Sequence, residues 1–406
     1  MKTIWIVYPY GDIIGEKFLE ARHIRFGRKL AESGYKVIYW TANFSHTFKK
    51  MRSRGWKTIP VCENFDIRLV PSCSYKRNIS FGRARFEIKY SRSLAKGFKK
   101  EAKPDLILTA GTGLMTAFYP VWPYVKKNHI HVIYDIMDVH LFNSYMEQHH
   151  KVLLPIAKIL TRNIERREKP FYEYVDVVCG LGKNQVEIAK MRTGNANIPS
   201  VLVYNSIFVD EFRRKMKKPC DIKLPEKLEG EVWCVYAGSL GPSYDIEPLL
   251  QCAEMVRENK EKIRFIIAGA GPQQSLVENA SKGNDLITFL GTVDPNYLPS
   301  IYSKCDIGLC TYASYSTVDM PDKFYDYTAA GLAIVNSLQG EIKDYVQEAG
   351  VQYKAEDSAS LHEKILLCSA NLNVYKQASW YLAERFDFSK QMEPLLRVIN
   401  EILEVT

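Results

Sequence analysis

The chain has 406 residues, of which 46% are hydrophobic and 25% are charged. That length exceeds what one hydrophobic core usually supports, so two domains are expected, and the composition excludes a disordered or fibrous protein. The formal net charge of +9 is unevenly divided, because residues 1–203 carry 34 Lys and Arg against 17 Asp and Glu while residues 204–406 carry 21 against 29. This division fits either attraction between two domains or an anionic partner of the first half.

The first apolar run, IWIVY, is too short for a signal-peptide core or a membrane span. The nine cysteines are scattered and form no CxxC, which argues against a disulfide framework or a zinc site. We therefore expect a reduced, cytoplasmic protein.

Short apolar runs alternate with longer amphipathic stretches along the first half. This pattern predicts strands at residues 4–8, 36–41, 106–109, 131–135, 175–179 and 200–204, with a helix over about 16–33. The following stretch, 206–225, is polar and punctuated by proline, as is typical of a linker.

The second half repeats the scheme, with strands predicted at 232–238, 265–271, 287–291, 306–312 and 332–336. Runs that are apolar on both faces indicate parallel sheets covered by helices. The predicted fold class is α/β, with two doubly wound domains, and ligands are expected at the carboxyl ends of the strands.

The segment MPDKFYDYTAAG predicts a proline-opened turn and a short helix that ends at Gly331. A helix N-terminus with Pro321 and Asp322 at its start can hold phosphates, and Lys323 adds a full charge. The carboxylate of Asp326, three residues on, can accept hydrogen bonds from ribose hydroxyls. The alternative is an exposed ion pair between Lys323 and Asp326 on a helix surface.

Three glycine turns follow predicted strands of the second half. They lie at Gly238 and Ser239, at Gly269 and Gly271, and at Gly291 and Thr292. Each lets backbone approach a ligand closely, although none completes a GxGxxG or P-loop motif. Together with the turn at Lys323 they predict a nucleotide pocket, whereas each alone is equally an ordinary strand-to-helix turn.

The order YAGSLG, IIAGAGP, FLGTV and PDKFYDYTAAGLAIV resembles that of family 4 glycosyltransferases of the GT-B fold. The resemblance covers nearly the whole chain and implies two facing Rossmann-like domains. Residues 1–205 would bind the acceptor, 226–390 would bind a nucleotide sugar, and a C-terminal helix over 391–406 would pack back on the first domain. Asp326 would bind the ribose, Lys323 and the Gly238 turn the diphosphate, and Gly291 and Thr292 would lie near the base.

Two departures from the family pattern concern the donor. Many members carry a glutamate eight positions before the ribose acid, where this chain has Val318, and an Arg and a Lys usually follow the first glycine turn, where this chain reads GSLGPSYDIEP. We therefore expect an altered contact to the donor sugar. We also expect Lys323 to be the only side chain that supplies positive charge to the diphosphate. The PDK pattern looks like the branch that builds bacterial surface polysaccharides, including capsule.

The resemblance implies transfer with retention of anomeric configuration. The chain has no Asp-x-Asp pair, so we expect no metal and no other cofactor. Asp138 and His140 follow a predicted strand and are candidates to orient the acceptor or move its proton. Alternatively Asp138 caps a helix and His140 packs in the fold. We interpret Asp135 as structural.

Two basic segments, 44–57 and 81–100, mix aromatic side chains with cations. Such segments suit a bilayer interface or a glycan acceptor, and no nucleic-acid-binding signature accompanies them. They could equally be a solvated basic surface. The residues selected as acceptor or membrane contacts are Phe48, Lys49, Lys50, Arg52, Arg54, Trp56, Arg83 and Arg85.

The expected function is transfer of a hexosyl-type sugar from a UDP- or GDP-linked donor to a lipid-linked glycan, at the inner face of the cell membrane. A sugar-nucleotide epimerase of the same architecture and a non-catalytic sugar-nucleotide-binding scaffold remain as alternatives. Nucleic-acid binding has the least support.

Overall fold

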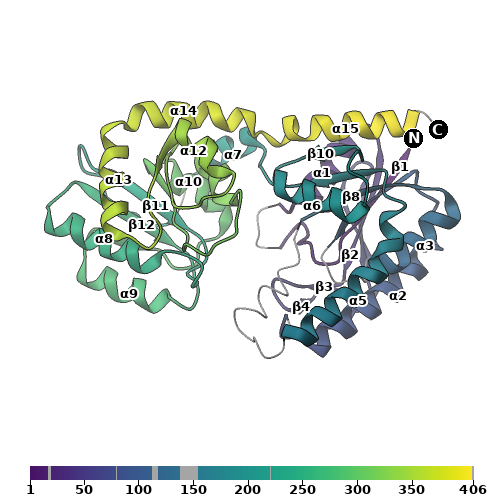
Figure 1. The fold of residues 1–406 in the computed structure, drawn as a ribbon. Coiled ribbons are helices and arrows are strands. Elements are labelled where there is room, and N and C mark those ends of the chain that lie inside the picture. The colour runs from purple at the N-terminus through teal and green to yellow at the C-terminus, as the bar shows by residue number, and fades with distance from the viewer. Residues whose placement is uncertain (17–19, 79, 112–117, 138–153, 220, 405–406) are drawn as a thin grey trace. The chain divides into compact units, whose positions relative to one another are not determined.

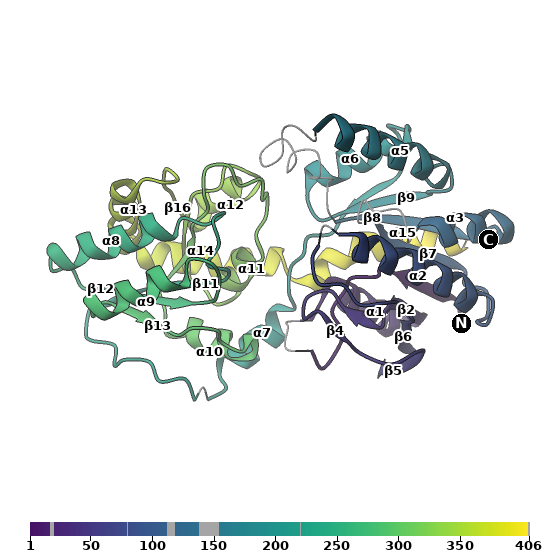
Figure 2. The same cartoon turned by 90° about the horizontal axis from the view of Figure 1, so that it is seen from below.

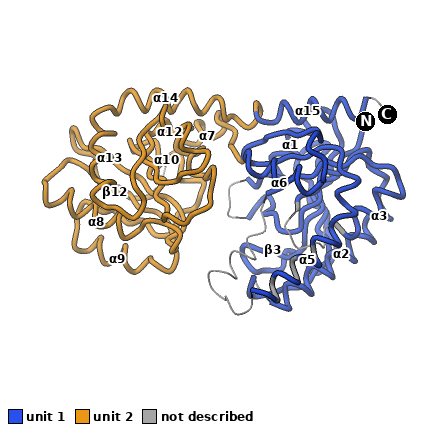
Figure 3. Tube along the Cα trace, viewed as in Figure 1, with its two compact units in different colours: residues 1–204, 391–406 blue, residues 205–390 orange. Residues whose placement is uncertain are grey.

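A computed structural model describes residues 1–16, 20–78, 80–111, 118–137, 154–219 and 221–404. The chain divides into two compact units, which are coloured separately in Figure 3. The first contains residues 1–204 and 391–406, and the second contains residues 205–390. Asp138 and His140, the predicted acceptor residues, lie outside the described residues.

The first unit is built on an eight-stranded sheet in the order β10-β9-β8-β7-β1-β2-β6-β5 (Figure 1). All neighbouring strands are parallel except β5, which runs antiparallel to β6 at the edge. The strands are β1 (Thr3–Val7), β2 (Lys36–Ala42), β5 (Lys57–Cys62), β6 (Phe65–Val70), β7 (Leu106–Gly111), β8 (His131–Ile136), β9 (Val177–Gly180) and β10 (Ser200–Leu202), beside a small hairpin of β3 (Phe44–Ser45) and β4 (Lys50–Met51).

Helices cover the sheet of the first unit because its central strands are apolar on both faces, as Ile4, Trp5 and Ile6 of β1 illustrate by their complete burial. Helix α2 starts at Ser80, whose hydroxyl accepts a hydrogen bond from the Arg83 amide at 3.2 Å. The helices are α1 (Arg22–Glu32), α2 (Phe81–Phe98), α3 (Phe118–Asn128), α5 (Leu154–Tyr172), α6 (Lys183–Thr193) and α15 (Phe388–Glu404).

A buried ion pair joins α1 to the middle of this sheet. Arg22 donates two hydrogen bonds to Asp135 of β8, from Nε to Oδ2 at 3.0 Å and from Nη2 to Oδ1 at 2.9 Å. Its Nη1 donates to the carbonyl oxygen of Val203 at 2.6 Å, and Nε2 of His23 lies 3.4 Å from Asp135 Oδ2. The pair therefore connects the start of α1, β8 and the segment after β10.

The second unit contains a six-stranded, wholly parallel sheet in the order β13-β12-β11-β14-β15-β16. This is the doubly wound order in which the chain changes direction between the first and fourth strands. The strands are β11 (Val232–Ala237), β12 (Ile263–Ala268), β13 (Ile287–Phe289), β14 (Ile307–Cys310), β15 (Ala333–Asn336) and β16 (Gly350–Gln352).

Helices lie on both faces of this second sheet, as Figure 2 shows from below. Asp357 caps α13 by accepting a hydrogen bond from the Ser360 amide at 2.9 Å. The helical elements are α7 (Val209–Met216), α8 (Ile246–Glu258), α9 (Gln274–Gly283), the 3₁₀ turn η2 (Pro295–Tyr297), α10 (Leu298–Tyr302), α11 (Asp322–Ala329), α12 (Ile342–Ala349), α13 (Ser358–Ala370) and α14 (Leu372–Arg385).

The structure differs from the sequence predictions in several places, among them strands β6 and β16, which the sequence did not predict. The predicted linker contains α7, which packs on α10 and α11 within the second unit. The basic segment 44–57 contains the β3–β4 hairpin, and the strands β5 and β6 follow it. Strand β5 was not predicted because it is an edge strand that is mostly exposed and contains Pro60, so it lacks the apolar run of a central strand.

Candidate functional site

The strands β11 and β14 pair with each other at the centre of the second sheet, where the strand order reverses. Connections leaving the carboxyl ends of these two strands diverge, which opens space for a ligand at that point. The loop after β11 begins with Gly238 and Ser239, and β14 leads through Thr311 and Tyr312 towards α11. These segments contain the turn at Gly238 and lead to Lys323, the two features that the sequence predicted to bind a diphosphate.

Helix α11 is fixed against the sheet by Tyr327. The phenol oxygen of Tyr327 accepts a hydrogen bond from the Ala237 amide of β11 at 3.1 Å. Its ring lies on Gly308 of β14, where a Cβ atom would come within 2.3 Å of the ring. These contacts hold the start of α11 beside the carboxyl ends of both strands.

The side chain of Lys323 lies in a cage of three tyrosines. Its Nζ is 4.1 Å from the ring centroid of Tyr236, 4.3 Å from that of Tyr244 and 4.8 Å from that of Tyr312. The residue is only 9% exposed, and its Nζ has no hydrogen-bond partner among the described residues. An ammonium group over aromatic faces is attracted by the ring quadrupoles, but it lacks the hydrogen bonds that water would give.

This environment changes the protonation of Lys323. Burial lowers the pKa of its ammonium group to about 7, although Cys310 and Asp322 act in the opposite direction. Free protein near neutral pH therefore contains both charged and neutral Lys323. A ligand that brings negative charge to Nζ would favour the charged form.

Proton uptake is therefore expected when an anionic ligand binds beside Nζ of Lys323. Negative charge from such a ligand raises the pKa of Lys323, so binding at about pH 8 should take up close to one proton, while binding at about pH 6 should take up almost none. Affinity should fall as the pH rises above about 7, up to the pKa of the bound state. Calorimetry in buffers of different ionisation enthalpy measures the uptake, and an equal uptake by Lys323→Met would refute this assignment.

The glycine turns bring backbone and side chains unusually close together. A Cβ atom on Gly238 would lie 2.6 Å from Cε of Lys323, so the lysine reaches its cage only past a glycine. A Cβ atom on Gly269 would lie 1.8 Å from the carbonyl oxygen of Gly238, and Gly269 has φ +150°. These two glycines therefore permit close packing around Lys323.

The amides of these turns are already hydrogen-bonded. The Gly238 N–H donates to the Ala268 carbonyl at 2.9 Å, and the Gly269 N–H donates to the Gly291 carbonyl at 2.7 Å. The sequence predicted open backbone at these turns, but these two N–H groups extend the pairing of β11, β12 and β13. Thr292 beside them is exposed, as is Ser239, whose carbonyl oxygen accepts a hydrogen bond from the Tyr236 hydroxyl at 2.5 Å.

The acids of α11 occupy different surroundings. Asp322, in the first helical turn after Pro321, accepts a hydrogen bond from Nδ2 of Asn205 at 2.8 Å. Asp326 is 8% exposed and lies close enough to Tyr302 to raise the pKa of that phenol, after the larger effect of burial. Because Lys323 and Asp326 are both buried, they do not form an exposed surface pair.

The three tyrosines of the cage were not among the residues predicted from the sequence. Tyr236 belongs to β11, Tyr312 follows β14, and Tyr244 lies in the loop before α8. Tyr312 ends the strand predicted at 306–312 and Tyr236 lies two residues before the end of the strand predicted at 232–238, which is the one signal that could have drawn attention to them.

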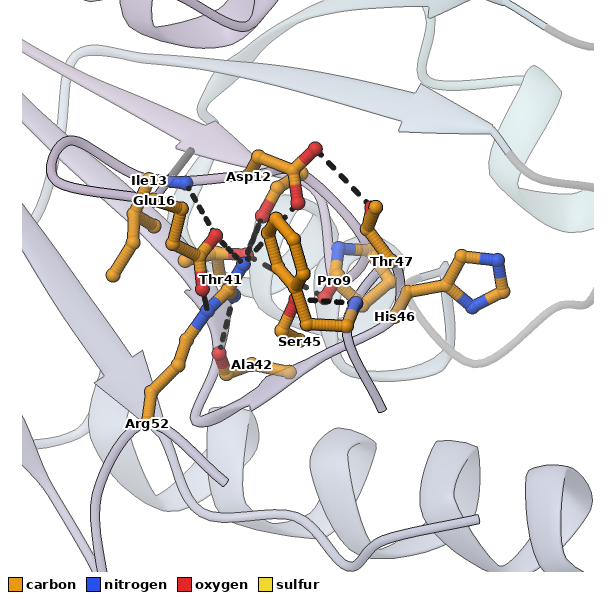
Figure 4. A network of polar contacts seen from close by, with 12 residues as sticks. Pro9, Asp12, Ile13, Glu16, Thr41, Ala42, Ser45, His46, Thr47 and Arg52 are labelled. Atoms are coloured by element: carbon orange, nitrogen blue, oxygen red, sulfur yellow. Dashed lines mark hydrogen bonds and ion pairs between the residues drawn. The ribbon is translucent and has the colours of Figure 1, made fainter. Parts of the chain in front are cut away.

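In the first unit, the basic segment 44–57 contains one cation that is fully engaged within the fold (Figure 4). Arg52 donates to both carboxylate oxygens of Glu16, at 2.8 and 2.7 Å, and to the carbonyl oxygens of Ala42 and Gly11, both at 2.9 Å. Its side chain is 5% exposed. Arg52 therefore stabilises the loop after β1 and offers little exposed surface to an acceptor or a membrane.

Lys49 and Arg83 are partly buried in a second polar cluster. Lys49 Nζ donates to Oδ1 of Asn78 at 2.6 Å and lies 4.5 Å from the ring centroid of Tyr75. Arg83 lies 4.9 Å from the ring centroid of Tyr10. Of the other selected residues, Phe48 is half-buried, and Lys50, Arg54, Trp56 and Arg85 are exposed.

A known family model matches most of the second unit. Residues 231–371 match the family model described as glycosyl transferases group 1. The matched span runs from β11 to α13 and includes the glycine turns, the tyrosine cage and Lys323. Comparison of the sequence with curated proteins gives no match.

Solved structures match the whole chain in fold. Sucrose-phosphate synthase from Thermosynechococcus elongatus has a TM-score of 0.71 at 15% identity, with 100% of both chains covered. HepE of Anabaena in complex with UDP-glucose has a TM-score of 0.64 at 12% identity, covering 99% of this chain and 100% of that one. WaaG, a glycosyltransferase involved in lipopolysaccharide biosynthesis, has a TM-score of 0.61 at 13% identity, covering 98% and 99%. The predicted α/β fold with two Rossmann-like domains, shared with GT-B glycosyltransferases, is confirmed.

The described residues show neither a metal-binding cluster nor a membrane-spanning helix. They contain no group of three or more His, Cys, Asp or Glu that could hold a metal ion. No helix among them combines the length and the apolar character needed to cross a membrane.

Proposed function

We propose that this chain is a glycosyltransferase that moves a sugar from a UDP- or GDP-linked donor to a glycan acceptor. The observation that carries the proposal is Lys323, a caged cation at the point where the strand order of a glycosyl transferases group 1 domain reverses. A buried cation without hydrogen-bond partners is well suited to a diphosphate, because charge-assisted contacts in a dry site are strong.

The proposed reaction retains the anomeric configuration, needs no metal, and belongs to family 4, in the branch that makes bacterial surface polysaccharide. In this mechanism Lys323 stabilises the leaving diphosphate, Asp326 binds the ribose, and Gly291 and Thr292 lie near the base. The acceptor is oriented by the first unit, with Asp138 and His140 as candidates. Val318 would leave the donor sugar without the carboxylate contact of many family members.

The acceptor is proposed to be lipid-linked, with the protein bound peripherally at the inner face of the cell membrane. The exposed face of α2 supports this, since spacing by three and four residues places its cations on one side of the helix. Phe81 and Ile88 on that face are 96% and 49% exposed, and the one acidic residue of α2, Glu87, is buried. Such a face suits an anionic bilayer. Its exposed cations are Arg85, Lys89, Arg92, Lys96 and Lys99.

The donor proposal is tested by calorimetric titration of the whole chain with UDP, GDP, ADP and their sugar conjugates, with and without EDTA. One diphosphate is expected to bind, with an affinity that the chelator leaves unchanged. Binding by none of them would refute the proposal. Binding without transfer to any lipid-linked acceptor would instead favour a non-catalytic sugar-nucleotide-binding scaffold, the alternative suggested by Val318 and by the missing Arg and Lys. Conversion of the donor in the absence of an acceptor would favour an epimerase.

A further inference from the structure

A pocket of about 310 Å³ lies in the first unit, outside the donor site. It is formed where the C-terminal end of α2 meets β2, β6 and the start of β5 at the edge of the sheet; Figure 2 shows α2 next to these strands. The volume is at the lower end of the range for small-molecule sites, which is the size of a single sugar or polyol with one substituent.

Two indole rings form the apolar part of this pocket. Trp40 is 1% exposed and Trp56 is 44% exposed, and their ring centroids are 6.4 Å apart at an angle of 86°. A Cβ atom on Gly97 of α2 would lie 2.7 Å from Trp56 and 2.9 Å from Trp40. The absence of a side chain at Gly97 thus lets the helix backbone contact both rings. This contact holds the indole of Trp56 in place although it remains partly exposed to solvent. A half-open indole offers an apolar face against which a ring can stack.

Cations dominate the rim of the pocket. Lys57, Arg68 and Lys100 line it together with one carboxylate, that of Glu101. Arg68 is held in place by Glu101, from Nε to Oε1 at 2.9 Å, and by Asp66, from Nη1 to Oδ2 at 3.1 Å. A guanidinium has five N–H donors, so donors remain for a ligand. Neither Lys57 nor Lys100 has an ion-pair partner among the described residues.

The pocket lies at the end of the basic face of α2. Lys96 and Lys99 are exposed within one helical turn of Lys100. An anionic ligand attracted to that face is therefore brought close to the pocket. A recess of this size takes one group rather than a polymer, which favours a headgroup over a nucleic acid.

We propose that this pocket binds a phosphate-bearing sugar or polyol, with the ring on Trp56 and the phosphate against Lys57, Arg68 and Lys100. The same chemistry is available from a phosphoinositide-like or phosphoglycerol lipid headgroup and from a free sugar phosphate. The pocket belongs to the first unit and the donor site to the second, so either proposal can fail while the other stands.

Substitution of neighbouring lysines separates a pocket from general surface charge. Lys100→Ala and Lys103→Ala remove the same charge from exposed positions three residues apart, but only Lys100 lines the pocket, and Lys103 is not one of the cations assigned to the bilayer face. Binding is measured by co-sedimentation with phosphatidylcholine vesicles containing phosphatidylglycerol or phosphatidylinositol, and by fluorescence titration of the free chain with glucose 1-phosphate and inositol 1-phosphate. Lys57→Ala serves as a second pocket variant.

Lys100→Ala and Lys57→Ala are expected to weaken binding about tenfold in whichever assay detects it, whereas Lys103→Ala changes it less than about twofold. Selective loss with vesicles alone assigns a lipid headgroup, and loss with the soluble phosphates assigns a free sugar phosphate. Equal losses in all three variants, or no binding in either assay, would overturn the proposal, as would tighter binding to duplex DNA than to either ligand. Donor titration should be unchanged in every variant.

Discussion

Replacing Arg22 by Ala is expected to lower the free energy of unfolding of the first unit by about 3–5 kcal/mol. The substitution leaves the Asp135 carboxylate completely buried without its two strongest hydrogen bonds. Burial alone would raise the pKa of Asp135, but Arg22 and His23 hold it well below its usual range, so the carboxylate is charged in the folded protein. The cost therefore reflects an uncompensated buried charge rather than one lost contact.

The measurement is urea unfolding followed by tryptophan fluorescence, with the transition of the first unit analysed separately because two units need not unfold together. Arg28→Ala is the matched control, since Arg28 belongs to the same helix and its pair with Glu20 has side chains 26% and 25% exposed. In Arg28→Ala the free energy of unfolding of the first unit should fall by less than about 1 kcal/mol. Combining Arg22→Ala with Asp135→Ala should recover part of the loss. Similar losses for Arg22 and Arg28 would show that the buried pair has no special role.

Replacing Lys323 by Ala is expected to weaken donor binding by about 1–3 kcal/mol, which corresponds to roughly 5-fold to 150-fold in affinity. The loss follows from the position of Lys323, whose Nζ is desolvated by three tyrosine rings and has no other hydrogen-bond partner among the described residues. Turnover should fall at least as much as affinity, because charge on the leaving diphosphate increases during transfer.

Calorimetry with the nucleotide sugar that binds the unchanged chain measures this effect. Lys282→Ala is a suitable control because it removes the same charge from the same unit. Lys282 is exposed and lies in the last turn of α9. Lys323→Met keeps most of the side-chain volume, so it separates loss of charge from loss of packing. If Lys323→Ala bound the donor as tightly as Lys282→Ala, Lys323 would have no part in the donor site.

The placement of Lys323 could be predicted only in part. Its motif and the glycine turns indicated a ligand site at the strand ends of the second half, because turn and helix-start chemistry is local in sequence. The cage was not predictable, since Tyr236, Tyr244 and Tyr312 come from separate segments whose side chains meet only after β11 and β14 pair. Likewise, the sequence predicted that the Gly238 and Gly269 amides were open to a ligand, whereas in the structure both donate hydrogen bonds to neighbouring strand ends.

Arg52 illustrates the same division in the first unit. In sequence it stands among exposed cations and aromatic residues, whereas in the fold it pairs with Glu16, 36 residues earlier. The sequence by itself determined the parallel α/β architecture, because apolar runs of strand length buried on both faces have few other arrangements. Only the tertiary structure decided which charged side chains are buried, which backbone groups are already bonded and where a pocket lies, because each depends on contacts between segments that are distant in the chain.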